Sequence, residues 1–175
     1  QHGLALAPDA YHPAGATDKR VTRWVTAHHN WNQVCNGGLL GAALALADEE
    51  PALARLVVTG AVKSLPLAMA AYAPDGAYPE GPGYWHYGTD YHVMLLAACS
   101  SLKRPFDDNP MLNKAGNSIL QLTSPTRLAF NFADGGSGLE KPSPAQCWLA
   151  AHFKDAVQAR HVRQLFTRAM AEDKR

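Results

Sequence analysis

Two stretches of the sequence contain residue types that can carry out acid–base chemistry. The longer one, residues 74–92, reads Pro-Asp-Gly-Ala-Tyr-Pro-Glu-Gly-Pro-Gly-Tyr-Trp-His-Tyr-Gly-Thr-Asp-Tyr-His, and the shorter one, residues 28–38, reads His-His-Asn-Trp-Asn-Gln-Val-Cys-Asn-Gly-Gly. Tyrosine and histidine can act as general bases, and amides can donate hydrogen bonds to a carboxylate. The alternative interpretation is an ordered Gly/Pro-rich connector whose aromatic side chains pack on neighbouring helices.

Composition limits the class of protein that can present these residues. The chain has 175 residues, 47% of them hydrophobic, and a net charge of +1, so we expect one domain or part of one, without a strong field for nucleic acid or a membrane. The three cysteines, Cys35, Cys99 and Cys147, are far apart and are expected to be buried free thiols. No apolar run of about 18 residues occurs, which predicts no transmembrane helix. The first residues lack the basic and apolar parts of an intact signal peptide.

The elements that must position the two stretches are mainly helices. Residues 1–28 are expected to form an extended lead-in, including a β-branched extended stretch at 20–27. Helical periodicity and start signals predict helices over residues 39–47, 51–72, 89–102, 110–122, 144–154 and from 155 towards the end. The long connections (28–33, 74–88 and 123–142) follow every second helix. In an array of antiparallel hairpins, they would share one face.

Residues 29–38 and 75–88 together resemble the heparinase II/III-like polysaccharide lyases, and the spacing of one helical hairpin between them is that of the family. Residues 130–135, Phe-Asn-Phe-Ala-Asp-Gly, are also similar. The resemblance implies an all-α fold made of antiparallel helical hairpins of an incomplete α/α toroid, occupying residues 29–175.

The resemblance also implies a reaction, the β-elimination of a polysaccharide that contains uronic acid, such as heparin, heparan sulfate or alginate. Tyr84 matches the family's catalytic tyrosine in a Glu-Gly-x-x-Tyr-Trp loop and is the candidate base and acid, with Tyr87 as its rival. Asn30 and Asn32 are candidates to neutralise the substrate carboxylate. The next candidates for that task are His29 and Gln33.

Other residues of the same loops are candidates for sugar binding, each with a structural alternative. Glu80 could bind a sugar hydroxyl or hold its loop. Trp31 and Trp85 could stack on sugars, although core packing is the more common role of tryptophan. Arg127 and Asp134 could touch an anionic sugar, although surface placement is the default interpretation of both. For Asn30 and Asn32 the alternative is helix N-capping, and Tyr91, His92 and Asp134 are expected to be structural or surface residues.

The resemblance further implies parts that this sequence does not contain. A β-sandwich normally follows the toroid and contributes a histidine, a tyrosine and in some members a structural zinc; a calcium there is also conceivable. We therefore expect this chain alone to be weakly active or inactive, to hold no cofactor, and to self-associate through exposed helix faces. The eight histidines show no zinc-site spacing. Acidic polysaccharide is the expected partner, with no nucleic acid or membrane, in the periplasm or outside the cell.

Two other functions remain open at the level of sequence. An α/α-toroid glycoside hydrolase would need two carboxylates across a cleft, and Glu80, Asp75, Asp90 and Asp134 are available. A non-catalytic helical module that binds carbohydrate or protein is the second alternative. It differs from a lyase in predicting that Tyr84→Phe leaves ligand binding and biological activity unchanged.

Overall fold

A computed structural model describes residues 4–12, 19–101 and 109–172, and these residues form an all-α structure, as predicted. Within them there are no β-strands, only isolated bridges between Thr123 and Ala129 and between Leu128 and Leu139. The α-helices are α1 (Ala7–Tyr11), α2 (Asn30–Ala45), α3 (Pro51–Met69), α4 (Pro82–Ser101), α5 (Met111–Gln121), α6 (Pro144–His152) and α7 (Ala156–Glu172). Short 3₁₀ helices add η1 (Leu4–Leu6), η3 (Lys19–Thr26) and η4 (Ala70–Tyr72).

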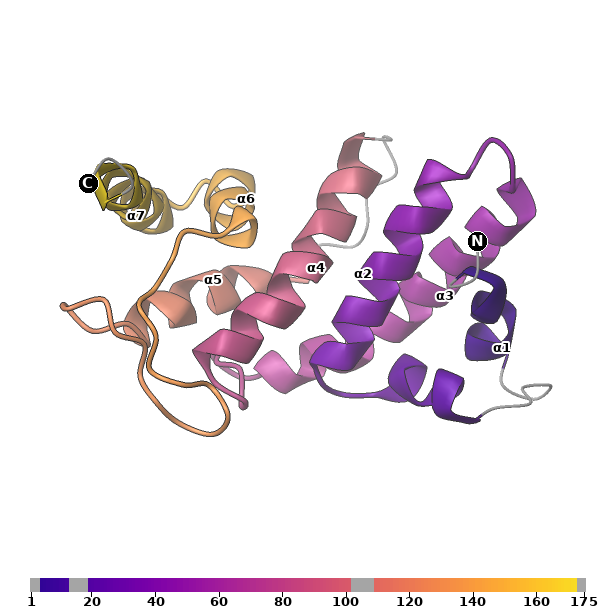
Figure 1. Cartoon of the computed structure of the whole chain (residues 1–175), viewed down its shortest axis with the longest axis horizontal. Helices are drawn as coiled ribbons and strands as arrows, with labels where there is room; N and C mark the ends of the chain where they lie inside the picture. Colours follow the sequence, from indigo (N-terminus) through magenta and orange to yellow (C-terminus); the bar gives the residue numbers. More distant parts are fainter. Residues whose placement is uncertain (1–3, 13–18, 102–108, 173–175) are drawn as a thin grey trace.

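The helices lie in a row of neighbouring pairs, from α1 at one end to α7 at the other (Figure 1). Helix α2 packs against both α3 and α4, α4 packs against α6, and α6 packs against α5 and α7. Thus α2, α4 and α6 contact each other in succession, and α4 has a neighbour on each side. Because of this central position, α4 contributes residues to the groups on both of its sides.

The core lies mainly between α2, α3 and α4. Helix α3 contributes Val57, Ala61 and Leu65, which follow helical spacing, and α4 contributes the fully buried Trp85. By length and composition the segment Pro51–Tyr72 is apolar enough to cross a membrane. In the structure, α3 packs one face, with Val57, Ala61 and Leu65, into the core, as a core helix does.

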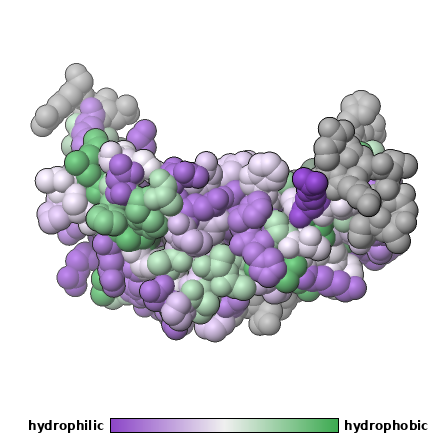
Figure 2. Space-filling view, turned by 90° about the horizontal axis from the view of Figure 1, so that it is seen from below, coloured by the Kyte–Doolittle hydropathy of each residue, from purple (hydrophilic) through white to green (hydrophobic). Residues whose placement is uncertain are grey.

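The three long connections meet at one end of the array, as the hairpin pattern predicted (Figure 1). The backbone N–H of Asn30 donates to Tyr78 Oη (2.6 Å), which joins the start of α2 to the second connection. A Cβ added to Gly81 would lie 2.9 Å from the carbonyl oxygen of Phe132, so the second and third connections are in backbone contact. Figure 2 views this end and shows hydrophilic residues across the middle, with hydrophobic ones gathered on the side of the third connection.

Local start signals gave correct helices in several places. Ser143 caps α6 through a capping box with Gln146, and Pro144 occupies the first turn. The predicted helix at 51–72 is α3 followed by η4, and α5 and α7 also begin within a few residues of the predicted positions. All three cysteines are free, but only Cys99 is buried, whereas Cys35 and Cys147 are half-buried.

Several predicted boundaries were wrong. Helix α2 begins at Asn30 instead of near residue 39, and α4 begins at Pro82 instead of Thr89, so much of the two polar stretches is helical. Proline favours the first turn of a helix, and the preceding Gly81 takes the φ of +90° that ends the connection. In α2 the polar side chains have tertiary partners, which outweigh weak local propensity.

The extended lead-in was also wrong in the part that the structure describes. Residues 4–11 form η1 and α1, and the stretch predicted to be extended at 20–27 is 3₁₀-helical, while residues 13–18 lie outside the described residues. The cause is tertiary packing. Trp24 meets the ring of Tyr11 edge-on at 5.6 Å, and the carbonyl of Val25 accepts a hydrogen bond from Ser64 Oγ (2.7 Å). Such contacts override the β propensity of the sequence.

Candidate functional site

The start of α2 and the second connection are joined by a compact polar cluster of Asn30, Tyr78 and Glu80. Asn30 Nδ2 donates to Glu80 Oε2, and Tyr78 Oη donates to the same oxygen (3.0 Å). Burial raises the pKa of Tyr78, so its phenol stays protonated and can serve as this donor. Asn30 is only 1% exposed, and its Oδ1 has no hydrogen-bond partner among the described residues. Turning the amide would set Oδ1 against the Glu80 carboxylate, so the orientation is fixed.

Asn32 holds the N-terminal segment and α3 to α2. It is fully buried, and its Nδ2 donates to the carbonyl of Val25 (3.2 Å) and to the hydroxyl of Ser64 (2.9 Å). Asn36, one turn later, donates to the same Ser64 hydroxyl (2.9 Å). These contacts give Asn32 a structural role, and we leave it out of the proposed site.

Gln33 lies in a second buried network between α2, η4 and α4. Its amide contacts Tyr72 Oη (3.2 Å) and His92 Nδ1 (3.3 Å), and Tyr72 also contacts Thr89 (2.9 Å). Burial raises the pKa of Tyr72 to about 12 and lowers the pKa of His92 to about 4, so both side chains are neutral at pH 7. Gln33 and His92 therefore belong to the core, which confirms the structural interpretation of His92.

Tyr84 lies on the face of α4 that meets α2. Gly88, one turn further along α4, is so close to α2 that an added Cβ would lie 3.2 Å from Asn30 Cβ and 2.3 Å from Gln33 Oε1. Residues four apart share a helix face, and side chains lean towards the N-terminus, so Tyr84 projects beside the start of α2. Its ring is partly buried and packs against the core.

The N-cap of α2 is His29, not Asn30 or Asn32, so the N-capping alternative for the two asparagines was wrong. His29 Nδ1 accepts a hydrogen bond from the backbone N–H of Trp31 (3.4 Å), and the rest of the imidazole is exposed. A ring whose Nδ1 accepts carries its proton on Nε2, which leaves an outward donor.

Trp31 and Tyr87 are exposed aromatic residues of the two motifs, and Phe130 of the third connection is exposed as well. Trp31 is 62% exposed, so core packing was wrong for this tryptophan, but it was right for Trp85, whose side chain is fully buried. The indole Nε1 of Trp85 has no hydrogen-bond partner among the described residues. Tyr87 is half-exposed and meets the ring of Tyr91 edge-on at 6.0 Å.

The opposite side of α4 borders a cavity of about 310 Å³ that the sequence did not reveal. His86 and Asp90, one turn apart, line it together with Glu140 from the third connection. Asp90 Oδ1 accepts from the backbone N–H of Ala145 (3.1 Å), which ties this face of α4 to α6. Burial lowers the pKa of His86, although the charges of Asp90 and Glu140 act in the opposite direction.

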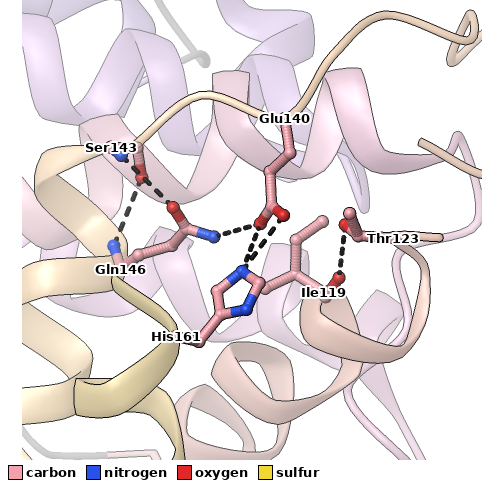
Figure 3. Close-up of polar contacts among 6 residues, drawn as sticks. All are labelled: Ile119, Thr123, Glu140, Ser143, Gln146 and His161. Atoms are coloured by element: carbon pink, nitrogen blue, oxygen red, sulfur yellow. Dashed lines mark hydrogen bonds and ion pairs between the residues drawn. The ribbon is translucent and has the colours of Figure 1, made fainter. Parts of the chain in front are cut away.

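Glu140 is the most constrained carboxylate of this region (Figure 3). It is buried, both of its oxygens lie 3.0 Å from His161 Nε2, and Oε1 also accepts from Gln146 Nε2 (2.8 Å). In Figure 3 the side chain points from the third connection towards His161, beside Ile119 and Thr123 of the α5 end. The i,i+4 spacing of His86 and Asp90 was the one local signal for this cavity, whereas nothing in the local sequence marked Glu140.

Within the third connection, Arg127 pairs with α7 and Asp134 lies at the surface. Arg127 Nη1 forms an ion pair with Glu172 Oε1 (2.6 Å) at the end of α7. Its φ of +69° is unusual for a residue with a side chain and fits the tight turn that follows Ser124. Asp134 is exposed.

Comparison with known proteins adds no assignment. Neither a protein-family model nor a curated protein matches this chain. Among the described residues, no group of three or more His, Cys, Asp or Glu side chains could hold a metal ion.

Proposed function

We propose that this chain belongs to a lyase of the heparinase II/III-like kind, which cleaves a uronic-acid polysaccharide by β-elimination. One observation carries the proposal. The two motifs that resemble the family meet at the same end of the helix array, where Asn30 bonds Glu80 and Tyr84 projects from the α4 face that covers Asn30. An incomplete α/α toroid and a periplasmic or extracellular location are parts of the same proposal.

The proposed reaction moves one proton and breaks one bond. Tyr84, as a phenolate, takes the proton on C5 of the uronic acid, and the released electron pair forms the C4–C5 double bond. The bond between C4 and the glycosidic oxygen then breaks, and the phenol of Tyr84 returns the proton to that oxygen. Tyr84 is preferred over Tyr87 because Gly88, four residues after Tyr84, lies against Asn30 at the start of α2, whereas Tyr91, four residues after Tyr87, lies against Gly37 further along α2.

The C5 proton becomes acidic only when the neighbouring carboxylate is neutralised. His29 suits this task because it is exposed, keeps Nε2 free of the capping bond and caps the positive end of α2. Asn30, which is buried and bonded to Glu80, acts in this proposal as a positioning residue for the loop that leads to Tyr84. Trp31 and Tyr87 are the exposed rings available for sugar stacking.

A non-catalytic carbohydrate-binding module is the second candidate. It is favoured by one observation, the burial of Asn30, Asn32 and Gln33, because fully internal amides cannot contact a substrate carboxylate in this arrangement. For a hydrolase, Glu80 would have to be free for catalysis, but it already accepts hydrogen bonds from Asn30 and Tyr78.

The two candidates differ in one experiment. The chain is incubated with heparin, heparan sulfate and alginate, and the unsaturated product is followed by its ultraviolet absorbance, while binding of the same polymers is measured separately. The lyase proposal expects Tyr84→Phe to abolish product formation and retain binding, with Tyr87→Phe as the matched control that keeps both. Binding without any product from the unmodified chain supports the module instead.

A further inference from the structure

The cavity on the α6 side of α4 has a polar lining that the Tyr84 side does not use. Its walls combine two carboxylates, Asp90 and Glu140, one imidazole, His86, and one ammonium group, Lys141, with apolar surface from Ile119 and Leu139. At about 310 Å³, the cavity is at the lower end of the range of roughly 300–1,000 Å³ that is usual for ligand sites, so it suits one small ring.

The polar groups are held in position, yet they keep unused hydrogen-bonding capacity. Asp90 Oδ1 is fixed by the N–H of Ala145, while Oδ2 has no partner within the part of the chain that the structure describes. Glu140 is fixed by His161 and Gln146, and a carboxylate has about four acceptor sites. In the same described part, neither ring nitrogen of His86 forms a hydrogen bond; the ring is fixed by an edge-on contact with Trp85 at 4.9 Å.

This combination fits a sugar better than an ion. Sugar hydroxyls both donate and accept, so they can use acceptors at Asp90 and Glu140 and a donor or acceptor at His86, while the C–H face of a pyranose packs on Ile119 and Leu139. Of the two carboxylates, Glu140 is paired with His161, so Asp90 is the group that most disfavours an acidic ring, and the cavity favours an uncharged one.

We propose that this cavity is a subsite for one uncharged pyranose unit of the polysaccharide, separate from the unit that reacts at Tyr84 on the opposite side of α4. The proposal rests on the proposed function, because that function names a polysaccharide as the ligand; it favours heparan sulfate, which contains uncharged sugar units, over alginate, which consists only of uronic acids. Pro82 and Gly83 line the cavity, and Tyr84 follows them on the same helical turn. A helix with its side chains is about 10 Å wide, and Phe132 and Gly135 of the third connection lie against Gly81 and Gly83, so the two sugars are not consecutive units of the polymer.

Titration of the chain with methyl β-D-glucopyranoside, followed by NMR signals of the His86 ring, tests the subsite without requiring turnover. We expect saturable binding that Asp90→Asn weakens by about tenfold, the usual cost of losing a hydrogen bond to a charged group. The variant keeps an oxygen for the N–H of Ala145, and Asp48→Asn, which removes an exposed carboxylate between α2 and α3, should leave binding unchanged. Ala129→Leu, which fills the cavity without changing a charge, should abolish binding.

The outcomes separate this proposal from the proposed function. Sugar binding that depends on Asp90 supports the subsite whether or not the chain cleaves a uronic-acid polymer. If turnover depends on Tyr84 but the Asp90→Asn and unmodified chains bind the glucoside with equal affinity, the subsite is contradicted and the lyase proposal is supported. Preference for methyl glucuronide over methyl glucoside would also overturn the subsite as an uncharged one.

Discussion

At the scale of single residues, burial decides which polar groups at the start of α2 can meet a ligand. Asn32 and Gln33 are fully buried and donate to other parts of the chain, whereas His29 and Trp31 in the same stretch are exposed. The motif therefore divides into an inner half that fixes α2 against α3 and α4 and an outer half that faces solvent. Only the outer half, with Tyr84 across from it, is available for chemistry.

His92 should make the stability of the protein depend on pH. In the unfolded chain its imidazole binds a proton below a pH of about 6.5, but burial lowers the pKa of the folded state to about 4. The unfolded state therefore binds more protons between these values. Stability is complete above pH 6.5 and decreases as the pH falls towards 4, by roughly 3 kcal/mol in total.

Urea unfolding at a series of pH values between 7.5 and 4.5 measures this dependence. His92→Gln should reduce the slope, since glutamine has no proton to gain and can still accept from the amide of Gln33. Equal slopes in the variant and the unmodified chain would show that His92 is not buried as a neutral base.

At the scale of elements, the contact between α2 and α4 depends on small residues. A Cβ added to Gly37 would lie 2.8 Å from the backbone oxygen of Tyr91, so the two helices are as close as a glycine permits. The neighbouring Gly38 has no atom within 4 Å of such a Cβ. Gly37 is thus needed for the close approach of α4, whereas Gly38 is not. Alanine substitutions at the two positions therefore form a matched pair of variants.

Gly37→Ala should destabilise the protein by about 1–3 kcal/mol, because a backbone atom cannot move aside and the helices must separate. Gly38→Ala should stabilise it by about 0.5–1 kcal/mol, because alanine is the better helix former and has free space here. The free energy of unfolding, from denaturant titration, checks both values. Similar effects of the two substitutions would contradict the close packing of α2 on α4.

The sequence predicted those elements that carry local signals, and its errors occurred where tertiary contacts decide. Ser143, in a capping box, and Pro144, in the first turn, predict the start of α6 from the local sequence. The starts of α2 and α4 were not, because polar, glycine-rich and proline-rich residues become helical there through contacts such as that of Asn30 with Glu80. Glu140 was missed because His161, its partner, is 21 positions away.

At the scale of the whole molecule, the end with the long connections presents both the candidate chemistry and exposed apolar side chains. Leu128, Phe130 and Leu139 of the third connection are exposed, and Phe130, at 64%, is the most exposed of the three. Figure 2 shows hydrophobic residues gathered on this side of the face. Apolar surface of this kind favours association between protein molecules.

We predict concentration-dependent self-association of this chain. Sedimentation velocity should show a sedimentation coefficient that rises with protein concentration, and Phe130→Ser should reduce this rise because it removes the most exposed ring of the connection. Val157→Ser, which changes an equally exposed apolar residue at the start of α7, is the matched control and should have a smaller effect. A monomer at all concentrations would contradict self-association.

The most direct test of the central claim is the ultraviolet absorbance of the unsaturated sugar formed from uronic-acid polymers. We predict a slow increase with the unmodified chain, a loss of about 10²–10⁴-fold with Tyr84→Phe, which is typical for removal of a general base, and near-normal rates with Tyr87→Phe. Unchanged product formation in Tyr84→Phe would contradict β-elimination by Tyr84.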